Sequence, residues 1–359
     1  MTLVAAVDPV RAVRVETKDE WNDLVAAHPM GHALQSWEWG ELKSAAGWSS
    51  VRLATHHGSA VAAAQVLIRP LFGTSAVYVP RGPMFSMDDA ADRALLQSVT
   101  ETARRHRAAF LRIEPHVSES APEAPYVHEM LGRLKMREAD PLQPRATVRL
   151  DLRREVDELL REVSKGHRAD VRRAERDGVT VRLGDRDEDL LAFHDIMLDT
   201  SLRKGFGIHA RSYYRDVWRR FDRDAALLLA DREDEVVGAM LIVGKGREAL
   251  YLYGGATEPG LKHRATHALA WRAIQWAKEH GCVAYDQWGV SDAIAREALH
   301  GETGSGAEAP GVKRDRALDG IYRFKKGWGG ELVRFLPAYD RVYLPPLYHL
   351  WLWRRGRSD

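Results

Sequence analysis

Two adjacent lysines near the C-terminal end of the chain have the setting that most readily supports chemistry. They occur in GIYRFKKGWGGE, residues 320–331, where Phe324 precedes Lys325 and Lys326 and a glycine-rich turn follows. A lysine that its neighbours hold in place presents a fixed positive charge, which can bind phosphate or stabilise an oxyanion. A solvated lysine in a surface turn is the alternative interpretation, and it suits Lys326 better than Lys325.

Motifs for the common kinds of covalent, metal and nucleotide chemistry are absent. The sequence contains no GxxxxGK[ST], no GxGxxG after a strand, no CxxC, no HExxH and no GxSxG, and its 15 histidines lack ligand spacing. We therefore expect neither a metal nor a dissociable cofactor. What remains is a reaction between two bound substrates, promoted by positioning and electrostatic stabilisation.

Length and composition predict a two-domain globular protein. The 359 residues exceed what one core usually supports, and 45% are hydrophobic and 29% charged. A net charge of +2 does not indicate a particular class of binding partner. The single cysteine, Cys282, is expected to be a small buried residue. The N-terminus lacks a basic signal region, and no stretch reaches the length of a membrane span. These features predict a cytoplasmic protein, which we expect to be a monomer.

The C-terminal stretch VYLPPLYHLWLWRRGR, residues 342–357, allows two interpretations. Aromatic rings beside a basic cluster suit peripheral contact with the inner face of a membrane. A final helix docked on the core, with a solvated tail, would carry the same residues.

The chain reads as a doubled α/β unit. In each half a meander of strands leads to a long helix and then to a strand with an acidic residue at its end, Glu114 in the first and Asp286 in the second. We expect one domain over 1–145, completed by 337–359, and a second over 146–336. Residues 300–320, rich in glycine, alanine and charge, read as a mobile loop placed as a lid would be.

Six short blocks follow one another from about Gln35 to Tyr343: LQSWEWGELK, YVPRGP, LRIEP, YLYGGAT, AYDQWGVSD and GIYRFKKGWGG. In this order they resemble the blocks of the FemABX family of aminoacyl-tRNA-dependent peptidoglycan transferases. The resemblance implies two tandem GNAT-like domains, the first on the acceptor side and the second on the aminoacyl-tRNA side.

Two departures refine the resemblance. Ordinary GNAT enzymes cradle the CoA pyrophosphate with an [RQ]-x-x-G-x-[GA] loop, which neither SMDDAADRALL nor TEPGLKHRATHALAW contains. A different acyl donor is then the simpler interpretation. No pair of sustained heptad helices is visible either, so the chain resembles the family members without a helical arm.

The resemblance implies roles for several residues. Lys325 matches a lysine that faces the acyl ester and the terminal tRNA ribose-phosphate, and Phe324 either stacks on the terminal adenine or belongs to the core. Lys43 and Arg211 match residues that share the diphosphate of the precursor, and Trp39 lies on one helix face with Lys43. The neighbouring tyrosine is Tyr213 or Tyr214, and Tyr214 is the one chosen here. A structural tryptophan with a surface lysine is the alternative at Lys43.

The remaining candidates lie at turns and strand ends. Arg81, in the turn PRGP, is placed either to clamp an oxyanion or to close the turn on the sheet. Glu114 stands where the family usually has aspartate, and it either holds the incoming amine or pairs with an arginine. Tyr253 and Asp286 are expected to face the substrate cleft of the second domain.

A basic stripe is predicted on one helix over residues 155–178. Arg168, Arg172 and Arg176, with Arg161 and Lys165, fall on one face opposite an apolar face. Such a stripe can follow the phosphates of a tRNA acceptor stem, and a solvated charged face is the alternative.

The sequence thus predicts an aminoacyltransferase that joins the aminoacyl group of a charged tRNA to an amine of a peptidoglycan precursor, either nucleotide-linked or lipid-linked. Lys325 and Glu114 would be the catalytic residues. An N-acyltransferase of the GNAT type acting on another cell-envelope or protein amine, and a non-catalytic tRNA-binding module, are the alternatives.

Overall fold

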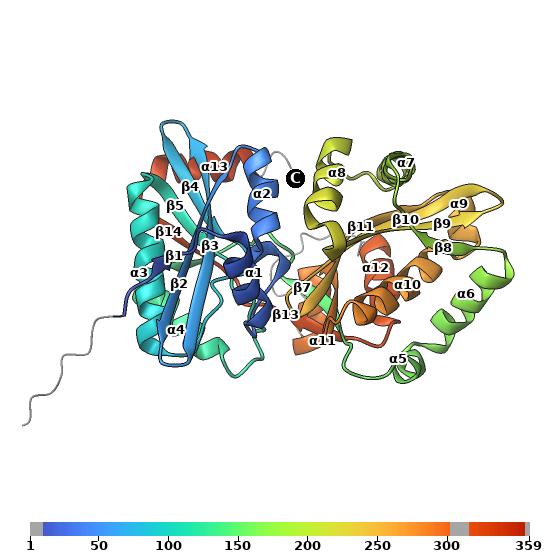
Figure 1. Ribbon diagram of the computed structural model, residues 1–359, viewed down its shortest axis with the longest axis horizontal. Coiled ribbons are helices and arrows are strands. Elements are labelled where there is room, and N and C mark those ends of the chain that lie inside the picture. The colour runs from blue at the N-terminus through green and yellow to red at the C-terminus, as the bar shows by residue number, and fades with distance from the viewer. Residues whose placement is uncertain (1–9, 302–315, 356–359) are drawn as a thin grey trace, which may run out of the picture. The chain divides into compact units, whose positions relative to one another are not determined.

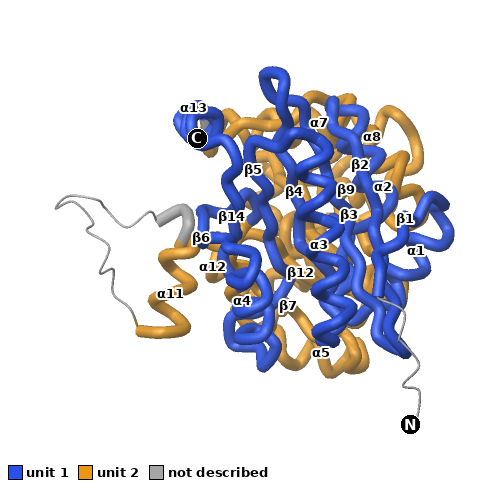
Figure 2. Tube along the Cα trace, turned by 90° about the vertical axis from the view of Figure 1, so that its left-hand side faces the viewer, with its two compact units in different colours: residues 1–143, 335–359 blue, residues 144–334 orange. Residues whose placement is uncertain are grey.

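The computed structural model describes residues 10–301 and 316–355 of a chain that folds as two compact units (Figure 2). Unit 1 comprises Met1–Gln143 and Phe335–Asp359, and unit 2 comprises Pro144–Arg334. The C-terminal segment therefore returns to the unit in which the chain begins. Most of the predicted lid over 300–320 lies outside the described residues.

The sheet of unit 1 has the strand order β1-β2-β3-β4-β5-β14-β6, and its β4–β5 pair is parallel (Figure 1). Along the chain the elements are β1 (Val13–Arg14), α1 (Lys18–Ala27), η1 (Ala33–Gln35), α2 (Trp37–Ala45), β2 (Ser49–His57), β3 (Ala60–Leu71), β4 (Thr74–Val79), α3 (Asp89–Arg105), β5 (Ala108–Ile113), α4 (Ala124–Arg133), β6 (Arg137–Ala139), β14 (Ala338–Val342) and α13 (Pro345–Arg355).

The sheet of unit 2 has the order β13-β7-β12-β11-β10-β9-β8, and its β11–β12 pair is parallel. The elements are β7 (Ala146–Asp151), α5 (Val156–Glu162), α6 (Lys165–Arg176), β8 (Thr180–Leu183), α7 (Asp187–Lys204), α8 (Arg211–Phe221), η2 (Asp222–Asp224), β9 (Ala225–Arg232), β10 (Glu235–Lys245), β11 (Glu248–Ala256), α9 (Glu258–Lys262), α10 (Ala265–Glu279), β12 (Ala284–Val290), α11 (Asp292–His300), α12 (Arg316–Lys326) and β13 (Glu331–Arg334).

Both units contain the predicted repeat. The order β2-β3-β4-α3-β5 in unit 1 corresponds to β9-β10-β11-α10-β12 in unit 2, and each meander lies in its sheet in chain order. A further antiparallel strand then pairs with the last one, β14 with β5 and β7 with β12. The first of these partners comes from the C-terminal return.

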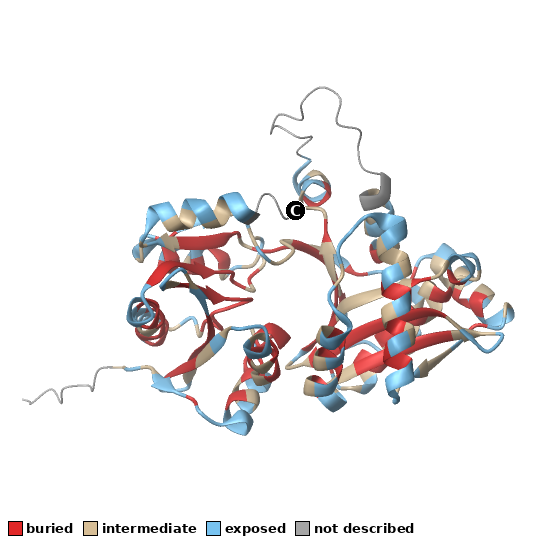
Figure 3. Ribbon diagram, turned by 90° about the horizontal axis from the view of Figure 1, so that it is seen from above, coloured by how far each residue is buried: buried red, intermediate tan, exposed pale blue. Residues whose placement is uncertain are grey.

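Each unit has its own core, formed where the long helix covers the sheet. On α3 the buried residues Ala91, Leu95, Val99 and Ala103 recur every four positions, which gives one apolar face. Buried positions, red in Figure 3, follow the strands of each unit, and exposed positions follow the outer faces of the helices. Cys282 is buried, as predicted.

Both predicted acidic residues lie where two parallel strands separate. The last paired residues of β4 and β5 are Val79 and Ile113, so Glu114 follows the end of the pairing. In unit 2 the last pair is Leu250 with Asp286. The prediction that Asp286 ends its strand is wrong, because β12 continues to Val290 through an irregularity. What the two positions share is the point at which parallel pairing stops.

Candidate functional site

A bulge in β12 sets two carbonyl groups beside Lys325. The pairing of β12 with β7 shifts register between Asp286 and Gly289, and Trp288 has a left-handed φ of 60°. Asp286 is fully buried and holds the bulge, since its Oδ1 accepts from the Trp288 N–H at 2.5 Å and from the Thr147 hydroxyl. The bend turns the carbonyls of Trp288 and Gly289 toward α12.

Lys325 lies in the last turn of α12, and its side chain is only 8% exposed. Its Nζ donates to Trp288 O at 3.0 Å and to Gly289 O at 2.7 Å. The Gln287 side chain donates in turn to Lys325 O at 2.9 Å, so main chain and side chain are both tied to β12. The interpretation of Lys325 as a solvated turn lysine is therefore wrong. Phe324, Lys325 and Lys326 form the end of α12, and the glycine-rich stretch follows it.

The environment of Lys325 tunes its charge. Burial lowers the pKa of Lys325 to about 8, and the Asp286 carboxylate acts in the opposite direction. An ammonium group has three N–H donors, of which two are used in the contacts with β12. The third can meet an oxygen that develops negative charge during acyl transfer.

The residues on either side of Lys325 make contacts within unit 2 that stabilise the fold. Lys326 is exposed, and its Nζ donates to Gly330 O at 2.7 Å. Phe324 is half-buried, with its ring centre 5.1 Å from that of His267 and 6.0 Å from that of Trp328. These contacts match the core interpretation of Phe324, and stacking of Phe324 on an adenine stays a prediction.

The start of α6 is locked to the end of α12. The Ser164 N–H donates to Gly327 O at 2.8 Å, and His167 Nε2 lies 2.9 Å from Phe324 O. Because a carbonyl oxygen can only accept, His167 carries a hydrogen on Nε2. A Cβ on Gly327 would lie 2.2 Å from the His167 ring, so this close approach requires glycine. His167 is a supporting residue that sequence reasoning missed.

The predicted basic helix over 155–178 is wrong, because the segment forms two helices. Helix α5 ends at Glu162 and α6 begins at Lys165. Between them Val163 leaves the helical region with ψ of 134°, and the Ser164 side chain caps α6. The side chains of Arg161 and Lys165 therefore do not share one helical arc.

The three arginines chosen for tRNA contact differ in their surroundings. Arg168 Nη1 donates to the carbonyls of Leu160, at 3.3 Å, and Arg161, at 3.0 Å, so it satisfies the C-terminal end of α5. Arg172 and Arg176 are exposed, four residues apart on α6. A phosphate-binding surface on α6 would consist of these two.

Two tyrosines of α8, Tyr213 and Tyr214, follow Arg211, and Tyr253 of β11 packs against them. Tyr214 is 1% exposed, and its hydroxyl accepts from the His209 N–H at 3.1 Å. Tyr213 is half-buried, and the Tyr253 hydroxyl donates to its oxygen at 3.4 Å. Burial raises the pKa of Tyr213 and of Tyr253, which keeps both hydroxyls protonated. Tyr213 is thus the more accessible of the two residues left open, and Arg211 is exposed.

In unit 1, Lys43 and Trp39 share a face of α2, as predicted. The Nζ of Lys43 lies 4.6 Å from the centre of the Trp39 ring, which is 5% exposed. Burial, and to a lesser extent the positive charge of Arg69, together lower the pKa of Lys43 to about 8. The lysine is therefore half-buried and electrostatically strained.

A second cation–aromatic pair adjoins the first. The Arg69 guanidinium lies 5.6 Å from the centre of the Trp48 ring, and the Trp48 N–H donates to Lys43 O at 3.1 Å. Two cations near each other favour an anion, because like charges repel until a ligand neutralises them. Sequence reasoning missed Arg69, since only the pairing of β3 with its neighbours brings it to this end of α2.

The predicted rigid turn around Arg81 is present. Arg81 has a left-handed φ of 46° and is 3% exposed, with its guanidinium 4.3 Å from the centre of the Phe335 ring. The Gly82 N–H donates to Glu114 O at 2.9 Å, and a Cβ on Gly82 would lie 2.8 Å from the Gln35 side chain. Glycine therefore permits a close approach that fixes the turn.

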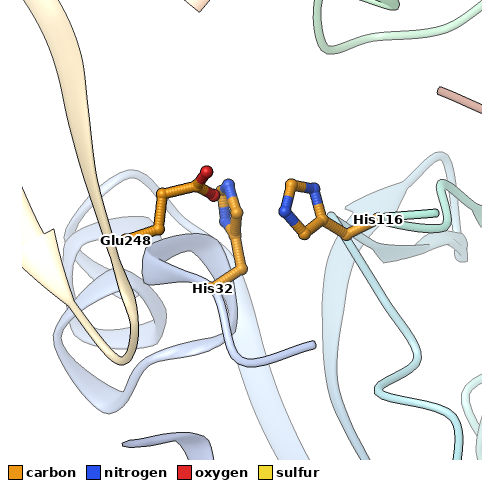
Figure 4. A group of neighbouring side chains, drawn as sticks. All are labelled: His32, His116 and Glu248. Carbon is orange, nitrogen blue, oxygen red and sulfur yellow. The ribbon is translucent and has the colours of Figure 1, made fainter. Parts of the chain in front are cut away.

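Buried rings continue from this turn. The His116 ring stacks on Phe335, with centres 4.7 Å apart at 30°, and His32 lies 4.5 Å from His116. Figure 4 shows the two histidines of unit 1 with their rings close together. Glu248, which the figure also labels, belongs to β11 of unit 2. Arg81 is thus packed at one end of a ring stack inside unit 1.

Glu114 is buried, and both of its oxygens accept hydrogen bonds. Oε2 accepts from the Tyr78 hydroxyl at 2.7 Å and from the Gln143 N–H at 3.1 Å, and Oε1 accepts from the Leu142 N–H. Burial, and then Glu114, raise the pKa of Tyr78 well above its ordinary value. The hydrogen bonds found for Glu114 thus join the end of β5 to Leu142 and Gln143, where the first segment of unit 1 ends. A carboxylate has about four acceptor sites, which leaves room on Oε1 for an amine.

The fold and the site define a class. Two GNAT-like halves in tandem, with a buried lysine anchored where two parallel strands separate, describe a protein of the tandem GNAT-like acyltransferase type. The fold agrees with solved structures: a crystal structure of FemX matches with a TM-score of 0.80 at 23% identity, covering 95% of this chain and 99% of that chain. A tandem GNAT protein from the clavulanic acid biosynthesis pathway matches with a TM-score of 0.53 at 15% identity, covering 93% and 98%. The predicted fold class is confirmed.

The chain belongs to the FemAB family, whose model matches residues 16–129, 131–233 and 230–351. Lipid II:glycine glycyltransferases of Staphylococcus aureus are 25% identical over 413 aligned positions, which cover 93% of this chain and 93% of each relative. The aligned positions outnumber the 359 residues of the chain, so these relatives carry segments that it lacks. The family resemblance read from the sequence is confirmed. Within residues 10–301 and 316–355, no helix has the length and apolar character needed to cross a bilayer.

Proposed function

We propose that this FemAB-family chain transfers the aminoacyl group of a charged tRNA to an amine of a peptidoglycan stem peptide. The observation that carries the proposal is the buried ammonium of Lys325, held by two carbonyls at the point where β11 and β12 separate. The aminoacyl ester of a charged tRNA is already activated, so the reaction needs a fixed cation and two positioned substrates rather than a protein nucleophile.

In the reaction the amine nitrogen forms a bond to the ester carbonyl carbon, and the carbonyl oxygen becomes negative. Lys325 stabilises that oxygen with its third N–H. The carbon–oxygen bond to the tRNA ribose then breaks, and the ribose hydroxyl leaves with a proton while the nitrogen loses one. A lysine amine with a pKa of about 10.4 must arrive neutral, and the free acceptor site of Glu114 is suited to orient it.

Acceptor binding is assigned to unit 1 and donor binding to unit 2. In unit 1, Trp39, Lys43 and Arg81 would hold the acceptor, and in unit 2, Arg172 and Arg176 would follow tRNA phosphates. Arg211 and the tyrosine beside it, also in unit 2, stay predicted contacts of a substrate phosphate. Because the relatives are named for lipid II, a lipid-linked precursor is the acceptor that we favour, with the chain acting at the inner membrane surface as a peripheral monomer.

The test is transfer by purified protein. Charged tRNA pools are offered with a lipid-linked or a nucleotide-linked precursor, and the product is read by mass spectrometry. A precursor heavier by one amino-acid residue supports the proposal. Transfer from acetyl-CoA without charged tRNA would instead assign the chain to the GNAT-type N-acyltransferases, whose tandem fold it shares.

A further inference from the structure

The inward face of α13 is firmly docked on unit 1. The Tyr348 and Trp351 rings lie 5.3 Å and 4.7 Å from the ring of Phe110 on β5. The Tyr348 hydroxyl donates to Asp340 Oδ2 at 2.6 Å, and the Arg112 guanidinium lies 4.8 Å from the Trp351 ring. These contacts confirm that the final helix is docked on the core of unit 1, and the tail after Arg355 lies outside the described residues.

The outward face of α13 carries two large apolar side chains beside the exposed His349 and Arg354. Leu350 is 37% exposed and Trp353 is 57% exposed, and their three-residue spacing places them on one face of the helix. A helix on the surface of a globular protein normally turns polar residues outward, whereas here the two most prominent outward side chains are apolar. The outward face therefore has the composition of a contact surface.

A second apolar group stands beside this face. The strands β3 and β4 are joined by Phe72 and Gly73, which have left-handed φ values of 45° and 72°. Asparagine and glycine favour such a turn, whereas a phenylalanine rarely adopts this conformation. Phe72 is nevertheless 61% exposed, and the Arg354 guanidinium lies 5.0 Å from its ring. The contact brings the hairpin tip to the end of α13.

Within the described side chains of α13, residues 345–354, no aspartate or glutamate occurs. The arginine of this stretch is Arg354, which lies beside the Phe72 ring. Exposed aromatic rings beside arginines match the headgroup region of a bilayer, where the rings lie at the interface and the cations meet anionic lipid. A protein partner would need a complementary acidic surface instead.

We propose that Phe72, Leu350, Trp353 and Arg354 form a surface that binds an anionic lipid bilayer, here called the Phe72–Trp353 surface. The assignment of a lipid bilayer as the partner of this surface rests in part on the proposed function, since a lipid-linked acceptor lies in a bilayer. The geometry goes further, because it names the residues that enter the interface and the face of unit 1 that meets the membrane.

The experiment is co-sedimentation of the full chain with vesicles, without any substrate. Vesicles of equal parts phosphatidylglycerol and phosphatidylcholine are compared with vesicles of phosphatidylcholine alone. The double variant Phe72→Asn, Trp353→Gln should bind the anionic vesicles at least tenfold more weakly, and Arg354→Gln about fivefold more weakly. Asparagine suits the left-handed turn and glutamine suits a helix, so both changes preserve the fold.

The matched control is Leu191→Gln, Leu202→Gln on α7 of unit 2, which removes two leucines that are 42% and 78% exposed. This control should bind vesicles like the unaltered chain. Equal binding by the Phe72 and Trp353 variant and the control would overturn the proposal. So would a dimer in sedimentation velocity that only the Phe72 and Trp353 variant abolishes, with no vesicle binding, because the surface would then join two copies.

Transfer assays separate this inference from the proposed function. With a soluble nucleotide-linked precursor, the variant and the unaltered chain should react alike. If neither transfers an aminoacyl group but vesicle binding still depends on Phe72 and Trp353, the proposed function fails while the membrane surface stands.

Discussion

Lys325→Met removes the ammonium group that the structure anchors on Trp288 O and Gly289 O, beside the end of the β11–β12 pairing. The side chain of methionine keeps the apolar stem but cannot donate to Trp288 O, Gly289 O or a developing oxyanion. A lost oxyanion donor raises the barrier by roughly 3 kcal/mol, so the rate of aminoacyl transfer should fall roughly 10²-fold. The KM values should change less, since the interaction strengthens in the transition state.

The assay is single-turnover transfer from charged tRNA at saturating acceptor, with folding checked by thermal unfolding. Lys326→Met is the matched control, because Lys326 is the next residue of the same helix, exposed and bound to Gly330 O. It should retain nearly full activity. Equal loss in both variants, or a folded Lys325→Met chain that keeps its rate within threefold, would refute the assignment of Lys325.

The pKa of Lys325 gives the same prediction a pH dependence. In the folded chain this pKa is about 8, below the ordinary value of 10.5, so the cation is lost as pH rises through about 8. The transfer rate should therefore fall above this pH, and Lys325→Met should lack that fall. Because the unfolded chain binds the proton up to higher pH, the free energy of unfolding should rise with pH between about 8 and 10.5. That rise should be smaller in Lys325→Met, and equal rises would contradict the burial argument.

Three further predictions concern binding and positioning. Changing Arg172 and Arg176 together to Ala should weaken tRNA binding and lower its log–log salt slope by roughly 0.9 per lost phosphate contact; an unchanged slope would make them a solvated face. Lys43→Met should raise the acceptor KM by roughly tenfold without changing donor affinity, and an effect on the donor alone would remove it from the acceptor site. His167→Ala should lower kcat more than KM and shift the alkaline limb of the pH–rate profile, because α12 loses a hydrogen bond that helps to place Lys325. His167→Gln should restore part of the rate. A loss of stability with an unchanged kcat would make His167 purely structural.

The sequence predicted the repeat because its signals are local. Apolar strands separated by glycine turns, and long amphipathic helices such as α3, follow from periodicity within short windows. The error over 155–178 has a local cause too. Periodicity alone cannot register the break at Val163 and Ser164, where the Ser164 side chain caps α6 and the Ser164 N–H donates to Gly327 O. That hydrogen bond is a contact over more than 160 positions.

The site could be predicted by residue type but not by environment. Motif resemblance singled out Lys325 and Asp286, but the bulge that joins them depends on the pairing of β12 with β7. Glu114 was likewise singled out by its residue type. No sequence signal shows that the Tyr78 hydroxyl and two backbone N–H groups donate to its carboxylate. Such contacts arise from packing between distant segments, which single-sequence patterns do not encode.

The central claim is tested most directly by the mass of the product formed from purified components. Purified protein, charged tRNA and a lipid-linked peptidoglycan precursor are incubated, with ribonuclease-treated tRNA as the control. The account predicts a precursor heavier by an amino-acid residue, formed only with intact charged tRNA and roughly 10²-fold more slowly by Lys325→Met. An unmodified precursor together with acetyl transfer from acetyl-CoA to an amine would contradict it.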